Sequence, residues 1–285
     1  MRTVRILALA AASALALAAC APVDDEGTAG ASESAASDGA LDTLTDGVLT
    51  IGTSDPGYEP WVVDNDPTNG EGFESAVAYA VAQQLGYSED QVEWVPVTFD
   101  QIIAPGAKSF DFAINQVSIS PERAENLDFS SSYYDTAQAV VTVEGSAAAD
   151  ASSLADLKGL KLGAMVGTTS LTIAEDVIDP STDIQVFNDN DQVKQALSSG
   201  LVDAVVYDLP TALYVTAAEL DGGILIGQLP ADDAAEADQF GLVLDKGSAL
   251  TGPVTEAVDA LREDGTLADL ESQWLTDAAG APVLQ

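Results

Sequence analysis

The stretch 73–97, FESAVAYAVAQQLGYSEDQVEWVPV, contains the pattern that recurs through most of the chain. Apolar residues in its first half recur every four positions and a glycine follows, at Phe73, Val77, Val81, Leu85 and Gly86. This spacing predicts an amphipathic helix over residues 73–85 that ends at the glycine. The run at 91–97 is rich in valine and predicts a strand directly after the helix.

Similar short apolar runs alternate with helical segments from Asp46 onward. The predicted strands are 48–53, 91–97, 111–115, 137–143, 161–166, 184–187, 203–207, 224–227 and 240–244. Further helices are expected to begin near residues 154, 191, 253 and 267, where capping residues, Pro253 or apolar spacing mark their starts. This alternation predicts an α/β fold with parallel strands, arranged in two α/β units.

The amino-acid composition of the chain excludes several classes of function. The 285 residues allow one or two domains, and a formal net charge of −38 excludes nucleic acid as a partner, because such a field repels phosphate. The chain has no histidine, which excludes Ser-His-Asp, Cys-His and zinc-histidine chemistry. Its single cysteine excludes an intrachain disulfide. We expect no metal, no cofactor and no catalytic residue.

The N-terminus carries targeting signals. Residues 1–19 combine two early arginines with an apolar run, as in a secretory signal peptide, and the small residues before Cys20 match the bacterial lipobox. We therefore expect an extracytoplasmic protein anchored in the cell membrane by lipid on Cys20. The alternative is that Cys20 is an incidental small apolar residue. Residues 20–45 are small and polar and predict a disordered tether, and no later stretch is long and apolar enough to span a bilayer.

Motifs in a fixed order resemble a known family. They are IGTSDPGYEP at 51–60, GFE at 72–74, SISPER at 118–123, DFS at 128–130, LKG at 157–159, GTT at 167–169, GLVDA at 200–204, FG at 240–241 and DGT at 264–266. Together they resemble the extracellular solute-binding proteins of family 3, which bind amino acids for ABC importers. The resemblance implies a two-lobed, type II periplasmic-binding-protein-like fold with a cleft between the lobes. Lobe one would comprise 46–138 and 240–277, lobe two 142–236, with hinges near 139–142 and 237–240 and a tail at 278–285.

The resemblance also implies residues for the two charged ends of an amino acid. Arg123 would bind the carboxylate, because its planar fork forms two parallel charge-assisted hydrogen bonds. Asp208, which follows an apolar run, would accept from the α-ammonium, and Thr168 and Thr169 would donate to the carboxylate from a strand-to-helix turn. The alternatives are a surface ion pair for Arg123 and helix capping for the other three.

Other residues would shape the cavity. The resemblance implies that Tyr58 and Trp61 form its walls, although core packing is the usual role of a single aromatic residue. The loop residues Asn115, Gln116 and Ser118 would contact the ligand, with Met165 beside them. Amides at positions 115 and 116 replace the small residues common in the family and should change the size of the cavity.

The resulting hypothesis is capture of an amino acid outside the cytoplasm and delivery to the transmembrane permease of an ABC importer, by a monomer. One alternative is an enzyme similar to cyclohexadienyl or arogenate dehydratase, which resembles this family and has the same scaffold. A second is a subunit that presents its ligand to a membrane sensor.

Overall fold

The computed structural model describes residues 41–230, 238–275 and 281–285. The expected signal peptide, Cys20 and the expected tether up to residue 40 lie outside these residues. Residues 41–45, the end of the expected tether, pack against the folded body, since Leu41 contacts the main apolar core and the Leu44 N–H donates to Asp111 Oδ1 at 2.8 Å. None of the described helices combines the length and the apolar character that crossing a bilayer requires.

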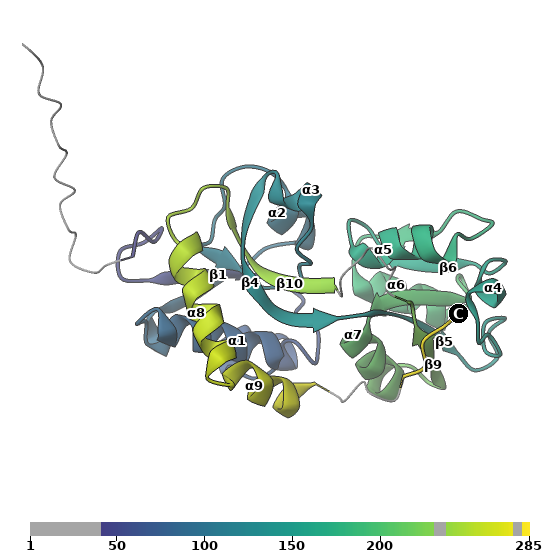
Figure 1. The fold of residues 1–285 in the computed structure, drawn as a ribbon. Helices are drawn as coiled ribbons and strands as arrows, with labels where there is room; N and C mark the ends of the chain where they lie inside the picture. Colours follow the sequence, from purple (N-terminus) through teal and green to yellow (C-terminus); the bar gives the residue numbers. More distant parts are fainter. Residues whose placement is uncertain (1–40, 231–237, 276–280) are drawn as a thin grey trace, which may run out of the picture. The chain divides into compact units, whose positions relative to one another are not determined.

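Two five-stranded sheets form the centres of two lobes (Figure 1). In lobe one the strand order is β2-β1-β3-β10-β4, with bounds Val92–Pro96, Leu49–Thr53, Phe112–Ala113, Asp238–Asp245 and Leu127–Thr136. In lobe two the order is β7-β6-β8-β5-β9, with bounds Gln185–Phe187, Leu162–Met165, Ala204–Asp208, Gln138–Val143 and Gly223–Gln228. The two-lobed α/β fold expected from the sequence is confirmed.

The sheets are mixed, so the expectation of parallel strands is correct only in part. β1 pairs in parallel with β2 and β3, and β6 pairs in parallel with β7 and β8. β10 runs antiparallel to β3 and β4, and β5 runs antiparallel to β8 and β9. The antiparallel strands are those that flank the passages of the chain between the lobes, outside the strand–helix–strand units that make neighbours parallel.

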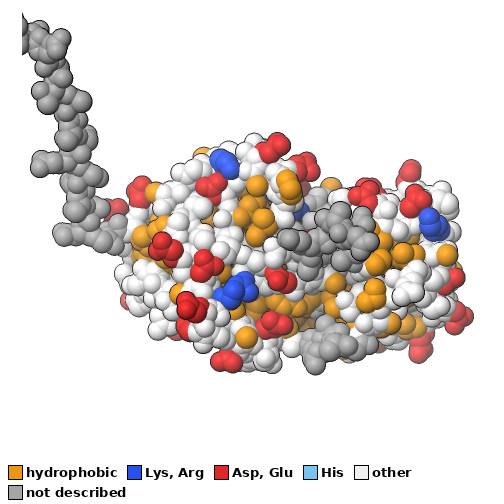
Figure 2. Space-filling view, in the orientation of Figure 1, with side chains coloured by type: hydrophobic (Ala, Val, Ile, Leu, Met, Phe, Trp, Pro, Cys, Tyr) orange, Lys and Arg blue, Asp and Glu red, His pale blue; other side chains and the backbone are white. Residues whose placement is uncertain are grey.

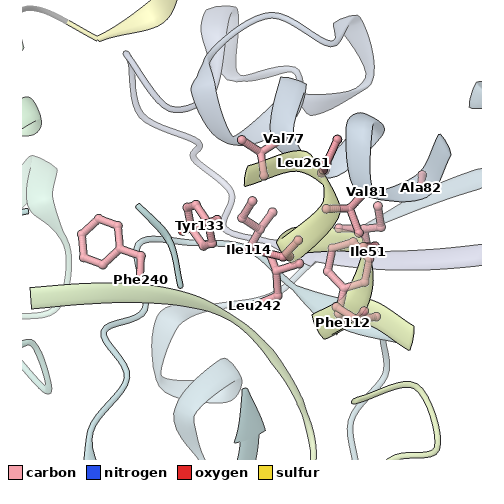
Figure 3. Close-up of a cluster of buried hydrophobic side chains, with 14 of the residues drawn as sticks. Ile51, Val77, Val81, Ala82, Phe112, Ile114, Tyr133, Phe240, Leu242 and Leu261 are labelled. Atoms are coloured by element: carbon pink, nitrogen blue, oxygen red, sulfur yellow. The ribbon is translucent and has the colours of Figure 1, made fainter. Parts of the chain in front are cut away.

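Helices cover both faces of the lobe-one sheet. One face packs against α1 (Phe73–Gln84), α8 (Thr251–Glu263) and α9 (Thr266–Trp274), and the other carries α2 (Phe99–Ile103). Figure 3 shows the first core, where Ile51, Phe112 and Leu242 from the strands meet Val77 and Val81 of α1 and Leu261 of α8. Shorter elements are 3₁₀ turns at Val63–Asn65, Pro67–Asn69 and Glu89–Gln91 and the helix α3 at Pro121–Ala124.

Lobe two also has a core on each side of its sheet, because successive side chains along a strand point to opposite faces. Ala139 and Val141 of β5 face α6 (Asn190–Ser198) and α7 (Leu209–Tyr214), whereas Val140 belongs to the core on the other side. That second core includes side chains of α4 (Leu154–Leu157) and of the π turn Ala174–Ile178 that follows α5 (Thr169–Ile173); a further π turn, Val215–Glu219, follows α7.

The last five residues belong to lobe two. Figure 1 shows the C-terminus near β9 and β5, and Val283 forms a parallel bridge with Gln228 at the end of β9. The Gln228 N–H donates to Pro282 O at 2.7 Å, and the Leu284 side chain is 2% exposed within the second core. This part of the expected tail therefore covers the edge of the lobe-two sheet.

The first passage between the lobes is short. β4 ends at Thr136 in the lobe-one sheet and β5 begins at Gln138 in the lobe-two sheet, so the chain crosses at Ala137. The expected hinge at 139–142 therefore lies inside β5, because pairing with β8 begins at Gln138. On the return, β9 ends at Gln228 and β10 begins at Asp238.

Candidate ligand-binding site

A cavity of about 330 Å³ is lined by residues from both lobes. It contains nine of the ten side chains expected at the site: Tyr58, Asn115, Gln116, Ser118, Arg123, Met165, Thr168, Thr169 and Asp208. Five come from lobe one and four from lobe two. Most follow the ends of strands β1, β3, β6 and β8, where loops leave the sheets. The volume suits a small molecule the size of an amino acid.

Arg123 enters the cavity from α3, whose first turn is capped by Ser120. Its Nη1 donates to Ser118 O at 2.7 Å and its Nη2 donates across the cleft to Gly167 O at 2.9 Å. The guanidinium carbon lies 5.6 Å from the centre of the Phe99 ring. Within the described residues, no carboxylate lies within 4.0 Å of this guanidinium. Neutral carbonyls leave the positive charge available to an anion.

Asp208 ends β8 in lobe two. Its side chain makes no capping hydrogen bond to α7, which does not support the alternative that it is a helix cap. Oδ1 instead accepts a hydrogen bond of 2.6 Å from Gln138 Nε2, which also donates to Asp238 Oδ2 at 2.8 Å. Burial and the neighbouring negative charge of Asp238 raise the pKa of Asp208 to about 7. A cation at this position would favour the ionised carboxylate.

The two threonines have different contacts. Thr168 Oγ1 accepts from the Leu171 N–H at 3.2 Å and donates to Met165 O at 2.8 Å, so it caps α5 as the alternative proposed. Thr169 Oγ1 donates to Asp238 Oδ2 at 2.7 Å and lies 3.1 Å from Ser118 Oγ in lobe one. Thr169 therefore joins the two lobes at the cavity.

Gln116 lines the cavity and is held by the carboxylate of Glu74. Its backbone N–H donates to Glu74 Oε1 at 2.7 Å, and its side-chain amide and the Tyr133 hydroxyl donate to the same carboxylate. This double contact holds Gln116 at a positive φ of 47°. Glu74 has no exposed surface, and burial raises its pKa to about 7. Beside it, Asn115 Oδ1 accepts from Ser54 Oγ at 2.9 Å.

Trp61 does not line the cavity, contrary to the expectation. Its side chain has no exposed surface and packs edge-on against Phe73, Tyr134 and Phe240, with ring centres 5.8–6.0 Å apart. Its Nε1 donates to Thr211 Oγ1 of α7 at 2.8 Å. The aromatic cluster of lobe one binds the ring more favourably than a polar cleft would, because it buries the whole indole.

Three further acids and an aromatic ring that were not predicted from the sequence also line the cavity: Asp55, Asp100, Asp189 and Phe99. Each lies within a few residues of the end of a predicted strand. This position after a strand is the feature of the sequence that could have indicated a place at the cavity. With Asp208, the cavity therefore has four carboxylates and one guanidinium. Acidic side chains also predominate over basic ones on the face drawn in Figure 2. Such a cavity attracts cations and repels anions.

In the part of the chain that the structure describes, no three or more cysteine, aspartate or glutamate side chains are placed so that they could hold a metal ion together. The described residues form two α/β lobes, which the chain connects twice, with a polar cavity between them. This arrangement is typical of proteins that bind a small ligand between two lobes.

Comparison with known proteins identifies the family. Residues 49–277 match the bacterial extracellular solute-binding proteins, family 3, and the chain belongs to this family. It is 28% identical over 225 residues to an L-arginine-binding protein of Pseudomonas aeruginosa, covering 77% of this chain and 85% of that protein. It is also 28% identical over 245 residues to the L-cystine-binding protein TcyJ of Escherichia coli, covering 85% and 88%.

Solved structures of amino-acid-binding proteins also match this chain. An ancestral arginine-binding protein bound to arginine matches with a TM-score of 0.67 and 31% identity, over 81% of this chain and 99% of that one. An ancestral amino-acid-binding protein described as a precursor of cyclohexadienyl dehydratase matches with a TM-score of 0.66 and 28% identity, over 81% and 96%.

Proposed function

We propose that this protein captures an amino acid with a cationic side chain outside the cytoplasm and delivers it to the permease of an ABC importer. The observation that carries the proposal is the charge of the cavity, whose lining includes four carboxylates and one guanidinium. A ligand with one negative and two positive charges complements this arrangement better than a neutral or acidic amino acid. The arginine-binding relatives support the same ligand class.

In this proposal each end of the ligand has a defined partner. Its carboxylate pairs with Arg123 and takes a hydrogen bond from Thr169, and its α-ammonium pairs with Asp208. Its side chain lies over the ring of Phe99, near one of the three other acids of the cavity, which are Asp55, Asp100 and Asp189. A cation over an aromatic face and near a carboxylate gains from both contacts.

Ligand binding would then favour the closed lobes. Arg123 belongs to lobe one and Asp208 and Thr169 to lobe two, so a ligand that contacts all three binds the closed form more tightly than the open form. That difference in affinity is what shifts the population toward closure. The closed form is the one that the permease would recognise.

Titration calorimetry with four amino acids tests this ligand class. We expect L-arginine and L-lysine to bind at least about tenfold more tightly than L-glutamine, and L-glutamate to bind most weakly, because each unfavourable charge contact costs at least about 1.4 kcal/mol. Tightest binding of L-glutamate would contradict the proposal.

We also propose the lipid anchor on Cys20 for this protein. Cell fractionation tests it. The wild-type protein should sediment with membranes and incorporate labelled palmitate, whereas the Cys20→Ala variant should do neither, because no other cysteine is present in the chain. Palmitate incorporation by Cys20→Ala would contradict the anchor.

A dehydratase activity remains the second candidate, because Asp208 is a cavity carboxyl group with a raised pKa, as a general acid requires. The charge of the cavity favours binding over this chemistry, since prephenate is a dianion that four carboxylates repel. Turnover of prephenate, measured by absorbance of its aromatic product, would establish the enzyme; we expect no turnover above that of buffer.

A further inference from the structure

Gln138 connects two carboxylates that belong to different strands. It is the first residue of β5, directly after the first passage between the lobes, and Asp238 is the first residue of β10, after the second. The Gln138 amide nitrogen donates to Asp208 at 2.6 Å and to Asp238 at 2.8 Å, and its Oε1 accepts from Ser170 Oγ at 2.6 Å. The side chain is 2% exposed, so these contacts fix its orientation.

The same network of hydrogen bonds extends to Arg123, at the end of the cavity where the carboxylate of the ligand is proposed to bind. Asp238 accepts from Thr169 Oγ1, and Thr169 lies 3.1 Å from Ser118 Oγ of lobe one. The carbonyl of Ser118 in turn accepts from Arg123. A continuous series of hydrogen bonds therefore joins Asp208 to Arg123 through residues at the two passages between the lobes.

The charge of this network is unbalanced. The titratable and charged groups that interact electrostatically with Asp208 are Asp238 of β10, Glu74 of α1, Arg123 of α3, and Tyr133 and Tyr134 of β4. The amide of Gln138 is neutral, so it orients both carboxylates without neutralising either. Two carboxylates that share one donor in a partly buried site favour the binding of one proton, or of another cation, between them.

We propose that Gln138 and Asp238 are positioning residues for Asp208: in the empty cavity Asp208 holds a proton beside the Gln138 amide and the carboxylate of Asp238, and the ammonium of the ligand takes the place of this proton. The proton leaves to solvent as the ammonium arrives, so that binding is coupled to release of a proton. The assignment of the ammonium to Asp208 rests on the proposed function, whereas the proton of the empty site does not.

Carbon-13 NMR of the ligand-free protein tests the empty site directly. The carboxyl carbon of Asp208, assigned by its loss in Asp208→Asn, should titrate with a midpoint near 7. Asp238→Asn removes the neighbouring negative charge and should lower that midpoint by at least about one pH unit. Gln138→Leu removes a hydrogen bond to the carboxylate and should raise it. Because Glu74 titrates in the same range, Glu74→Gln serves as the control and should leave the midpoint within about half a unit.

A midpoint near 4 in the wild-type protein, or an unchanged midpoint in Asp238→Asn, would overturn the proposal. A purely structural role of Asp238 would reduce stability without moving the midpoint, so the pH profile separates the two roles. If Gln138→Leu does not fold, the Asp238→Asn comparison alone decides, because asparagine keeps the shape of the side chain.

Calorimetry with L-arginine as the probe tests the exchange of proton for ammonium. The affinity of the wild-type protein should fall about tenfold from pH 8 to pH 6, and that of Asp238→Asn by less than about threefold. Equal pH dependence in both would contradict the exchange. If L-arginine does not bind at any pH, the proposed ligand class fails, and the NMR titration of the empty site still decides the role of Gln138 and Asp238.

Discussion

The two charged ends of the cavity are held in opposite ways. At one end the guanidinium of Arg123 donates to the neutral carbonyls of Ser118 and Gly167. At the other end the carboxylate of Asp208 shares the amide of Gln138 with a second acid, Asp238. The first end keeps an unneutralised positive charge in a fixed position, and the second has more negative charge than its own donors can balance.

This difference shows what a ligand supplies at each end. The Arg123 end needs one carboxylate in a defined orientation, whereas the Asp208 end gains from any compact cation that replaces a proton. The Arg123 end should therefore select ligands by the orientation of their carboxylate. The affinity for a cation at the Asp208 end should depend on pH. These contributions can be separated with variants that alter one end of the cavity, and with variants that alter residues supporting the two lobes.

Asp208→Asn should have the largest effect on binding. The amide keeps the shape of the side chain but loses the charge, and we expect affinity for L-arginine to fall at least about thirtyfold, since removing one partner of an enclosed charge pair costs about 2–5 kcal/mol. Calorimetry measures this, with the exposed Asp176→Asn as the matched control. Binding of Asp208→Asn within threefold of wild type would remove the acidic end from the mechanism.

Leu284→Ala should have the next largest effect, and on stability alone. Leu284 fills the lobe-two core beside β9, and its truncation should cost about 2 kcal/mol of unfolding free energy. Chemical denaturation measures the loss, and the neighbouring Val283→Ala, whose side chain is 55% exposed, should cost less than about 0.5 kcal/mol. Equal stability of the two variants would show that the terminal residues do not support the lobe that carries Asp208.

Glu74→Gln should change how stability depends on pH. The folded pKa of Glu74, about 7, lies above its ordinary value of 4.5, so the folded state binds the extra proton and this contribution to stability is lost as pH rises through 7. Between pH 6 and pH 8 the wild-type protein should lose about 1 kcal/mol more stability than Glu74→Gln. Denaturation at both pH values tests this, and a steeper loss in the variant would contradict it.

Thr211→Val should have the smallest effect. It removes the hydrogen bond between Trp61 and α7, which joins the lobes outside the cavity. The closed form should lose about 1 kcal/mol, which weakens binding about threefold to tenfold without altering any residue of the cavity. Trp61→Phe should give the same loss, and the two changes together should not add, since both remove one contact.

The matched control for this contact is Trp94→Phe, because Trp94 donates to Tyr79 within lobe one and not across the cleft. Its affinity should equal that of the wild-type protein. An equal loss in Trp94→Phe and Trp61→Phe would show that indole hydrogen bonds act through general stability and that the contact between the lobes has no separate role.

Local sequence patterns predicted nine of the ten strands, because buried strands are short apolar runs between turn residues. β4 was not predicted, since its serines at Ser130, Ser131 and Ser132 conceal the apolar positions that pack at Leu127 and Tyr133. The mixed direction of the strands was also missed. Pairing partners depend on how the chain passes between the lobes, which a local pattern does not contain.

The site was predicted less completely than the fold. Motifs placed nine of ten expected residues at one cavity, because those residues follow strand ends in the sequence. The contacts that set their charge and position could not be found in this way. Glu74 and Gln116 are 42 residues apart, and Gln138 and Asp238 are 100 apart. Trp61 was misplaced because sequence alone does not distinguish an aromatic core from an aromatic wall.

The central claim is that Arg123 binds the carboxylate of a cationic amino acid. Calorimetry of the wild-type protein and Arg123→Ala with L-arginine and with agmatine, which lacks the carboxylate, tests it as a double-mutant cycle. We predict that the wild-type protein prefers L-arginine at least about a hundredfold and that Arg123→Ala loses most of this preference. The same preference in both proteins would contradict the claim.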